Sequence, residues 1–373
     1  MRILFFTEVY PDEHGFLGGL FIHNQAVALK NSGHEVAVMF VDFRSIKHRR
    51  EFAFSKYELD TIPVFRYSFP VGPIYFLIDA VGSQLAERLY QKTERIFGEA
   101  DLIYVHFGGC MKHIISTCKR HDKPYVITEH GSDVLTGELS EKEIAERREG
   151  YNHASAVIAV SEALKRKLCQ ITEKEITVIP NIIPDYMFDG DLNNKEQKDE
   201  YYRYISVGNL IKSKAFDITI KAFAEIAKKN PKSKLIIVGD GAEEKELKNL
   251  VQALEIDNIV EFRGRMENKA LAMLLRGCDC FVLPSKFETF GVVYIEAMAS
   301  GLPVIATKCG GPEEFVDESN GILIDLDDVD GLKQAMEKIR NGMYNSKFLR
   351  DQVWKMYSAN AVVEKITGVF RNI

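Results

Sequence analysis

Short apolar runs alternate with longer amphipathic stretches along most of the chain. Residues 2–7 and 35–40 are predicted strands, and apolar positions recur at helical spacing in 22–32 and 82–97. Further elements are predicted at 102–106, 125–128, 156–159 and 176–179 (strands) and at 162–170 (helix). Strands that alternate with helices are typical of a parallel sheet covered by helices on both faces.

The same alternation begins again after a polar, charged segment at 185–202, which has the composition of a linker. The predicted strands beyond it are 204–207, 234–238, 259–262, 280–283 and 303–306. The predicted helices are 217–229, 243–254, 269–276, 292–300 and 328–340, followed by one long helical tail to Ile373. The pattern therefore predicts two doubly wound α/β domains.

Composition agrees with two globular domains and excludes several classes. The chain has 373 residues, of which 46% are hydrophobic and 27% charged. The net charge of -6 excludes a global basic field for nucleic acid. No apolar run approaches the roughly 18–20 residues of a membrane span, and Glu8 ends the short apolar N-terminal run. Six irregularly spaced cysteines predict no disulfide framework, so a cytoplasmic protein is expected.

The richest candidate for chemistry is the stretch 283–305. A strand ends at Pro284, the next loop carries Glu288, and Gly291 opens a helix that carries Glu296. Amides at a helix start can hold a phosphate, and carboxylates bind hydroxyls. Together they suit a nucleotide-sugar bound in the cleft between the two sheets. The alternative is a pair of solvated glutamates near a helix start.

Two glutamates with seven residues between them precede the run Ala297-Met298-Ala299-x-Gly301-x-Pro303-Val304-Ile305. This arrangement resembles the signature of the retaining glycosyltransferases of family four. Shorter matches occur at 18–19, 128–131, 160–161, 179–181, 206–208, 239–241 and 308–314. The resemblance implies the GT-B fold, two Rossmann-like doubly wound domains that face a deep interdomain cleft.

The domains implied by this resemblance are an acceptor-binding domain, 1–185 with 355–373, a linker at 186–202, and a donor-binding domain at 203–354. The resemblance gives Glu296 the donor ribose and Glu288 the donor sugar hydroxyls. The other implied donor contacts are the base pocket at Arg265 and Met266, the pyrophosphate-binding backbone of Phe290, Gly291 and Val292, and the strand end at Gly208.

Lys214 matches the family's pyrophosphate-binding lysine, with a catalytic role. Asn209 occupies the position of a usual arginine, and Ala215 that of a usual glycine. The missing guanidinium removes a bidentate phosphate clamp, so either Lys212 compensates or donor binding is weaker. An ordinary helix-start lysine is the alternative for Lys214. Gly239-Asp240-Gly241 lacks the third glycine of a dinucleotide fingerprint, which favours a tight turn.

In the first domain, Gly18 and Gly19 precede a helix, where glycine lets backbone amides approach a ligand closely. The resemblance places both glycines at the acceptor and Gly19 also at the donor phosphate. It makes His130 a catalytic-site contact to the transferred sugar. A structural histidine is the alternative, and Glu129 cannot be separated from His130 by sequence.

The resemblance implies transfer of a hexose-type sugar from a UDP- or GDP-sugar to the hydroxyl of a sugar or lipid-linked acceptor, with retained configuration. Family members use a front-face mechanism that requires no cofactor or metal site. Cell-surface polysaccharide or glycolipid synthesis is the expected setting. The alternatives are an epimerase or phosphorylase of the same fold, or a noncatalytic nucleotide-sugar binding protein.

Peripheral contact with the inner face of a membrane is a second expectation left open by the sequence. It rests on the basic cluster at 47–50 and the aromatic-rich stretch at 65–80. A solvated loop and a core-facing stretch are the favoured interpretation of these segments.

Overall fold

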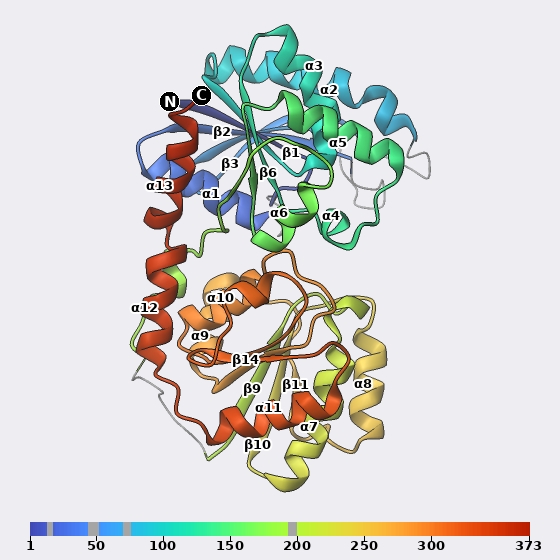
Figure 1. Ribbon diagram of the computed structural model, residues 1–373, viewed down its shortest axis with the longest axis vertical. Helices are drawn as coiled ribbons and strands as arrows, with labels where there is room; N and C mark the ends of the chain where they lie inside the picture. Colours follow the sequence, from blue (N-terminus) through green and yellow to red (C-terminus); the bar gives the residue numbers. More distant parts are fainter. Residues whose placement is uncertain (13–17, 44–51, 70–75, 193–199) are drawn as a thin grey trace. The chain divides into compact units, whose positions relative to one another are not determined.

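The computed structural model describes residues 1–12, 18–43, 52–69, 76–192 and 200–373 (Figure 1). The chain divides into two compact units, Met1–Ile182 with Ala359–Ile373, and Ile183–Ser358. This division places residues 183–185 and 355–358 in the second unit, where the resemblance implies the first domain. The last helix belongs to the first unit although it follows the second unit in sequence.

The first unit is built on an eight-stranded sheet with the order β3-β4-β2-β1-β5-β6-β7-β8. Its strands are β1 (Arg2–Thr7), β2 (Glu35–Asp42), β3 (Ala53–Leu59), β4 (Ile62–Ser68), β5 (Leu102–His106), β6 (Tyr125–Glu129), β7 (Ala156–Ala159) and β8 (Ile176–Val178). All neighbouring strands are parallel except β3 and β4, which form an antiparallel edge. The carboxyl ends of β1, β5 and β6 therefore meet at one edge of the sheet.

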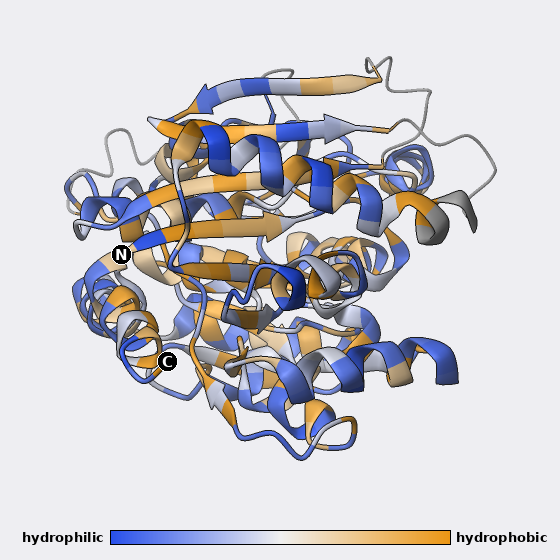
Figure 2. Cartoon of the chain, turned by 90° about the horizontal axis from the view of Figure 1, so that it is seen from above, coloured by the Kyte–Doolittle hydropathy of each residue, from blue (hydrophilic) through white to orange (hydrophobic). Residues whose placement is uncertain are grey.

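Helices cover both faces of this sheet, with α2 and α3 on one side and α1 and α13 on the other (Figure 1). The helices are α1 (Leu20–Asn31), α2 (Phe76–Phe97), α3 (Met111–Arg120), α4 (Ser132–Thr136), α5 (Glu141–His153), α6 (Glu162–Leu168) and α13 (Ala359–Phe370). The strands are coloured largely as hydrophobic and the exposed helix faces as hydrophilic (Figure 2). This pattern explains why near-continuous apolar runs mark the central strands.

The second unit has a six-stranded, wholly parallel sheet with the order β11-β10-β9-β12-β13-β14. Its strands are β9 (Tyr202–Val207), β10 (Ser233–Val238), β11 (Val260–Phe262), β12 (Cys280–Leu283), β13 (Val304–Thr307) and β14 (Gly321–Ile324). The strand order reverses between β9 and β12. In open α/β sheets, ligands bind outside the carboxyl ends of the strands at such a switch point.

The helices of the second unit are α7 (Phe216–Lys229), α8 (Glu244–Ala253), α9 (Asn268–Arg276), α10 (Val292–Ala299), α11 (Val329–Asn341) and α12 (Ser346–Tyr357). Helix α7 packs on β10 and β12 and contacts α8 and α11, whereas α10 packs on β13 and contacts α12. The two predicted doubly wound α/β domains are confirmed.

Several elements differ from the sequence-based expectation. The predicted single helical tail is wrong, because Ser358 is extended and separates α12 from α13. The β3–β4 hairpin, β14, and the helices α3 and α5 are additional to the predicted elements. The aromatic-rich stretch at 65–80 begins within β4, and its Phe65 is buried in the first unit.

The membrane expectation is only partly accessible to the structure. The basic cluster at 47–50 and Tyr75 lie outside the described residues. Among the helices that the structure describes, none has both the length and the apolar character needed to cross a bilayer.

Candidate active site

The switch point of the second unit joins a lysine to a glutamate. Lys214 ends a short 3₁₀ turn, Lys212–Lys214, in the loop that follows β9. Its ammonium donates a hydrogen bond to Glu288 Oε1 at 2.7 Å, and Ser285 Oγ donates to the same oxygen at 2.8 Å. Glu288 is only 9% exposed. Opposite charges from two different loops thus meet at the edge where open α/β sheets bind ligands.

The adjacent helix α10 presents its amino end. Gly291, directly before α10, has a φ of 91°, and an added Cβ there would lie 2.9 Å from the Tyr294 ring. Only glycine accepts that backbone conformation without strain. The amides of Val292 and Val293 have no acceptor within the helix, so this end suits a phosphate group.

The segment after β13 is hydrogen-bonded to the loop that carries Glu288. The Gly311 amide donates to the Glu288 carbonyl at 2.8 Å, and the Glu288 amide donates to the Cys309 carbonyl at 3.1 Å. An added Cβ at Gly311 would lie 2.4 Å from the Phe290 carbonyl oxygen. The Phe290 side chain is buried, so at this position only the backbone is available to a ligand. The run 308–314 therefore fixes the shape of the 288–291 loop.

Glu296 lies one turn into α10 and is half-buried. Within the described part of the chain its carboxyl group has no hydrogen-bond partner. Burial raises the pKa of Glu296 to about 7. A carboxylate with this environment can gain a partner when a hydroxyl-bearing ligand binds.

The remaining expected donor residues lie on the loops after β9 and β11. Asn209, which follows Gly208, is exposed. An added Cβ at Gly239 would lie 1.9 Å from the Gly208 carbonyl oxygen. This close approach explains why position 239 is a glycine, with no need for a bound dinucleotide. The Arg265 guanidinium donates to Asp240 at 2.9 Å, and both side chains are about half exposed.

Arg265 is paired with Asp240 and not with Glu288. Met266, the next residue in the chain, is half-buried.

In the first unit, the structure separates Glu129 from His130. Glu129 is fully buried, and its Oε1 accepts from the amides of His130 at 2.9 Å and Gly131 at 2.8 Å. Its Oε2 accepts from the Gly108 amide at 2.8 Å and the Tyr151 hydroxyl at 2.5 Å. A carboxylate with these four bonds orders the strand-end loops and has little capacity left for a ligand.

His130 has one ring nitrogen that is engaged and one that is not. Its Nε2 lies 3.1 Å from Nδ1 of His106, whereas its Nδ1 is buried without a partner among the described residues. Burial lowers the pKa of His130 to about 3, so the ring is neutral at physiological pH. The Phe21 ring at the start of α1 lies 4.6 Å from the His130 ring.

The contact between the Phe21 and His130 rings places the loop at Gly18 and Gly19 near His130. Gly19 precedes α1 with a φ of 78°, and an added Cβ would lie 2.4 Å from the Val9 carbonyl oxygen. Gly18 directly precedes it and is half-buried. The positive φ and the close backbone approach explain why glycine is needed at position 19.

Sequence reasoning missed His106 and Ser285 as site residues. His106 ends the predicted strand 102–106, and Ser285 follows the predicted strand 280–283. Both could have been found by listing the polar residues at every strand end, because parallel strands bring these ends to one edge.

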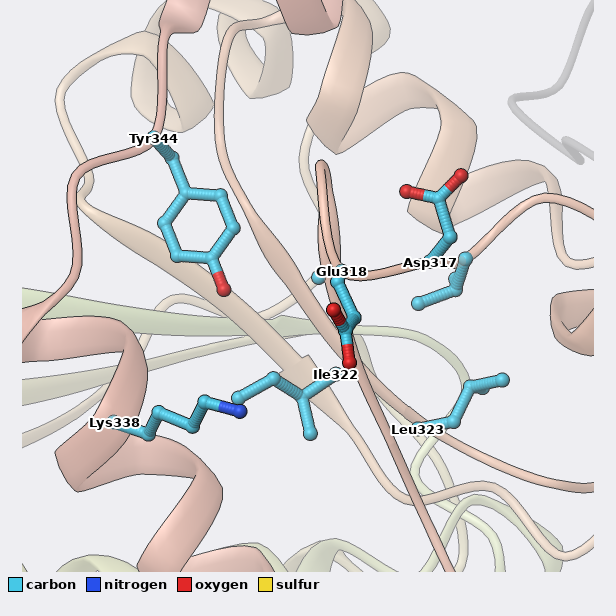
Figure 3. Close-up of a pocket in the computed structure, with 8 residues that line it drawn as sticks. Asp317, Glu318, Ile322, Leu323, Lys338 and Tyr344 are labelled. Carbon is cyan, nitrogen blue, oxygen red and sulfur yellow. The ribbon is translucent and has the colours of Figure 1, made fainter.

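A different hollow, of about 500 Å³, lies beside the amino end of β14. Figure 3 shows Lys338 and Tyr344 next to Glu318 and Ile322 there. Because it lies at the opposite end of β14 from the switch-point edge, it is not part of the candidate active site.

Acidic triplets of the Asp-x-Asp type occur at 189–191, 325–327 and 328–330. In the last two, the carboxylates pair with lysines or cap α11, through Asp325–Lys308, Asp327–Lys286, Asp328–Gly331 and Asp330–Lys333. Among the described residues, no group of three or more His, Cys, Asp or Glu side chains could hold a metal ion.

Two family models match the chain in succession. The model for glycosyltransferase family 4 matches residues 18–185, and the model for glycosyl transferases group 1 matches residues 189–348. The chain therefore belongs to the group 1 glycosyltransferases of family 4.

Individual relatives agree with this assignment. The chain is 27% identical to an uncharacterized glycosyltransferase of Methanocaldococcus jannaschii, over 100% of this chain and 98% of the relative. It is 26% identical to a putative teichuronic acid biosynthesis glycosyltransferase of Bacillus subtilis, over 99% of this chain and 95% of the relative. A solved structure of HepE from Anabaena, in complex with UDP and glucose, matches with a TM-score of 0.77 and 21% identity over 100% of both chains. The fold is GT-B.

Proposed function

We propose that the protein is a retaining glycosyltransferase that moves a hexose from a nucleotide diphosphate sugar, carrying UDP or GDP, to an acceptor hydroxyl. The observation that carries this proposal is the Lys214–Glu288 pair at the switch point of the second sheet. A cation and a helix amino end suit the pyrophosphate of such a donor, and a carboxylate suits its sugar hydroxyls.

The donor roles follow from the chemistry of each group. The amides at the start of α10 bind the pyrophosphate, and Lys214 neutralises charge on the departing phosphate. Glu288 accepts hydrogen bonds from sugar hydroxyls, and Glu296 from the ribose. Arg265 and Met266 line the base pocket, with Arg265 already oriented by Asp240 at 2.9 Å.

The reaction exchanges one bond at the anomeric carbon. The bond from that carbon to the β-phosphate oxygen breaks, and a bond to the acceptor oxygen forms on the same face. The acceptor proton passes to the departing phosphate oxygen, which needs no protein base. Lys214 and the helix amides stabilise the negative charge that develops on that oxygen. The proposal requires no cofactor.

In the first unit, His130 contacts the transferred sugar, and the loop at Gly18 and Gly19 contacts the acceptor. The neutral state of His130 suits a hydrogen bond rather than a charge interaction. The acceptor is a sugar or lipid-linked hydroxyl, and cell-surface polysaccharide synthesis is the proposed setting. The similarity to the putative teichuronic acid glycosyltransferase supports that setting.

A noncatalytic nucleotide-sugar binding protein is the second candidate. Asn209 favours it, because an exposed amide replaces the guanidinium that would clamp the phosphate. The Lys214–Glu288 pair favours transfer instead, because a cation held by a carboxylate is suited to the charge that develops on a leaving phosphate.

The test has two stages. A thermal-shift panel of UDP-, GDP- and ADP-sugars is expected to show stabilisation by one base series. The stabilising donor is then incubated alone, with free phosphate, and with candidate acceptors, and the products are analysed. Transfer with retained configuration supports the proposal. Change of the donor alone indicates an epimerase, use of phosphate a phosphorylase, and binding without any product a binding protein.

A further inference from the structure

The first unit contains a glutamate–histidine pair that the proposed mechanism does not use. Glu8 directly follows β1, and His113 lies in the first turn of α3. Nδ1 of His113 is 2.5 Å from Oε1 of Glu8. The histidine side chain is 2% exposed, whereas the glutamate side chain is 28% exposed. The histidine is therefore part of the interior, and the carboxyl group that it contacts reaches the surface.

Only one arrangement of protons leaves no buried donor of this pair unpaired. Nε2 of His113 is buried and has no hydrogen-bond partner among the described residues. With the proton on Nδ1, the ring donates to the Glu8 carboxylate and keeps only a lone pair at Nε2. A proton on Nε2 would be a buried donor without an acceptor, which proteins avoid more strictly than an unused lone pair. His113 therefore donates to Oε1 of Glu8.

Helix α2 leaves a close-fitting space for the His113 ring. An added Cβ at Gly82, inside α2, would lie 2.3 Å from Cδ2 of that ring. Glycine inside a helix lowers the stability of the helix relative to alanine, so the presence of Gly82 is explained by the histidine. The Phe43 ring also lies 5.6 Å from the His113 ring. The surroundings thus fix a ring whose hydrogen-bond partner, within the described part of the chain, is Glu8 alone.

Glu8 lies at the sheet edge that carries His130. The pairing of Phe6 with Val105 places Glu8, two residues further along the chain, at the level of Phe107. The Phe107 ring is 5.2 Å from the His130 ring. The carboxyl group therefore belongs to the same edge as the residue that the proposed function places at the transferred sugar.

One oxygen of Glu8 remains open to a ligand. Oε1 accepts from His113, whereas no described residue forms a hydrogen bond with Oε2. The next residue, Val9, approaches the glycine loop, since an added Cβ at Gly19 would lie 2.4 Å from its carbonyl oxygen. A carboxylate oxygen in this position can accept a charge-assisted hydrogen bond from a hydroxyl group.

We propose that Glu8 binds a sugar hydroxyl of the acceptor through Oε2, and that His113 is a positioning residue that holds the Glu8 carboxylate in place. The identification of the ligand as the acceptor rests on the proposed function. The location of Glu8 in the first unit favours the acceptor over the donor, because Lys214 and Glu288 lie in the second unit.

The test on the active enzyme is steady-state kinetics with the acceptor that product analysis identifies. Glu8→Gln keeps the size of the side chain and an oxygen for His113, but removes the charge from the ligand-binding oxygen. We expect the acceptor KM to rise about tenfold, with the donor KM unchanged, because a hydrogen bond to a charged group is the stronger one. Glu58→Gln, at an exposed glutamate of β3, is the matched control and should change neither KM. An unchanged acceptor KM in Glu8→Gln, or an equal rise in both KM values, would overturn the proposal.

Two variants of His113 separate positioning from packing. His113→Asn keeps an N–H near the place of Nδ1, whereas His113→Leu removes it. We expect His113→Leu to raise the acceptor KM as Glu8→Gln does, and His113→Asn to stay within about threefold of the wild type, although both lower the melting temperature. Equal acceptor KM values in the two variants would assign His113 a packing role only. In the wild type, NMR with ¹⁵N-labelled histidine is expected to show the proton of His113 on Nδ1, and a proton on Nε2 would overturn the positioning role.

If the protein transfers no sugar, the proposed function fails, and sugar binding then decides the role of Glu8. The probes are the methyl glycosides of glucose, galactose and mannose, observed by saturation-transfer difference NMR with the full chain. We expect at least one probe to bind the wild type and Glu58→Gln equally and Glu8→Gln more weakly. Equal binding to all three proteins, or binding of no probe, would overturn the proposal.

Discussion

Glu296 is a carboxyl group whose protonation is poised near neutral pH. Its pKa of about 7 means that roughly half of the free protein carries the protonated form near that pH. Under the proposed function, a ribose that donates hydrogen bonds to Glu296 favours the carboxylate, so nucleotide binding releases a proton as it lowers this pKa. The proposed role therefore predicts that donor affinity depends on pH.

We predict that the affinity for UDP or GDP rises as pH increases toward 7 and levels off above it, by up to about tenfold per pH unit between the bound and the free pKa values. The measurement is isothermal titration calorimetry at several pH values in buffers of different ionisation enthalpy. Glu296→Gln is the control, because it retains the titration of the nucleotide's own phosphates. The same pH slope in both proteins would exclude Glu296 as the coupled group.

Lys214 and Lys212 form a matched pair for testing the leaving-group role. Only Lys214 is paired with Glu288, whereas Lys212 is exposed in the same turn. Lys214→Ala is expected to lower kcat about 100-fold or more, because a preorganised cation at the developing phosphate charge is lost. Lys212→Ala should change kcat by less than about threefold, as expected for an exposed cation. Near-normal turnover of Lys214→Ala would remove its assigned role, and a large loss in Lys212→Ala would indicate that Lys212 compensates for Asn209.

At the scale of elements, the start of α7 contains a local conflict between sequence and backbone. Ala215, directly before the helix, has a φ of 49° and is buried. A left-handed conformation costs a non-glycine residue roughly 1 kcal/mol. This left-handed conformation at Ala215 follows the turn in which Lys214 donates its hydrogen bond to Glu288.

Ala215→Gly is therefore expected to raise the free energy of unfolding of the second unit by about 0.5–1 kcal/mol. The matched control is Ala222→Gly in the interior of α7, which should lower it by about 1 kcal/mol. Chemical denaturation monitored by circular dichroism measures both changes. A loss of stability in Ala215→Gly would show that the positive φ is not strained at this position.

The elements show where sequence reasoning succeeds and where it stops. Period and apolar runs located β1, β5 and β12 within a residue, because buried parallel strands are continuously apolar. The β3–β4 edge was missed because β3 is half-exposed and the apolar residues of the mostly buried β4 are interrupted by Pro63 and Arg66. The helix break at Ser358 was missed because neither Gly nor Pro marks it.

The candidate site was foreseeable only as far as single motifs allow. Glu288, Gly291 and Glu296 follow from one local stretch, so spacing alone suggested them. The Lys214–Glu288 and His106–His130 contacts join residues that are distant in sequence. Only the strand order of each sheet brings those partners together, and no local pattern encodes it.

At the scale of the whole molecule, the two units differ in how the chain builds them. The second unit is one continuous segment, Ile183–Ser358, whereas the first needs the segment Ala359–Ile373 to complete its core. Val362, Ile366 and Phe370 of α13 are buried there, with Phe370 5.1 Å from the Tyr104 ring. The stability of the first unit therefore depends on a segment that follows the second unit in sequence.

A chain that ends at Ser358 is expected to lose the cooperative unfolding of the first unit. Each buried apolar side chain of α13 contributes about 1.5–3 kcal/mol, so losing several of them removes a large part of a typical domain's stability of about 5–15 kcal/mol. The second unit should keep its own transition and its stabilisation by nucleotide, because Lys214, Glu288 and α10 all lie within it. Differential scanning calorimetry with and without UDP or GDP resolves the two units. A chain that ends at Phe370 is the control, since residues 371–373 are exposed. An unchanged melting profile for the chain that ends at Ser358 would show that α13 is dispensable for the first unit.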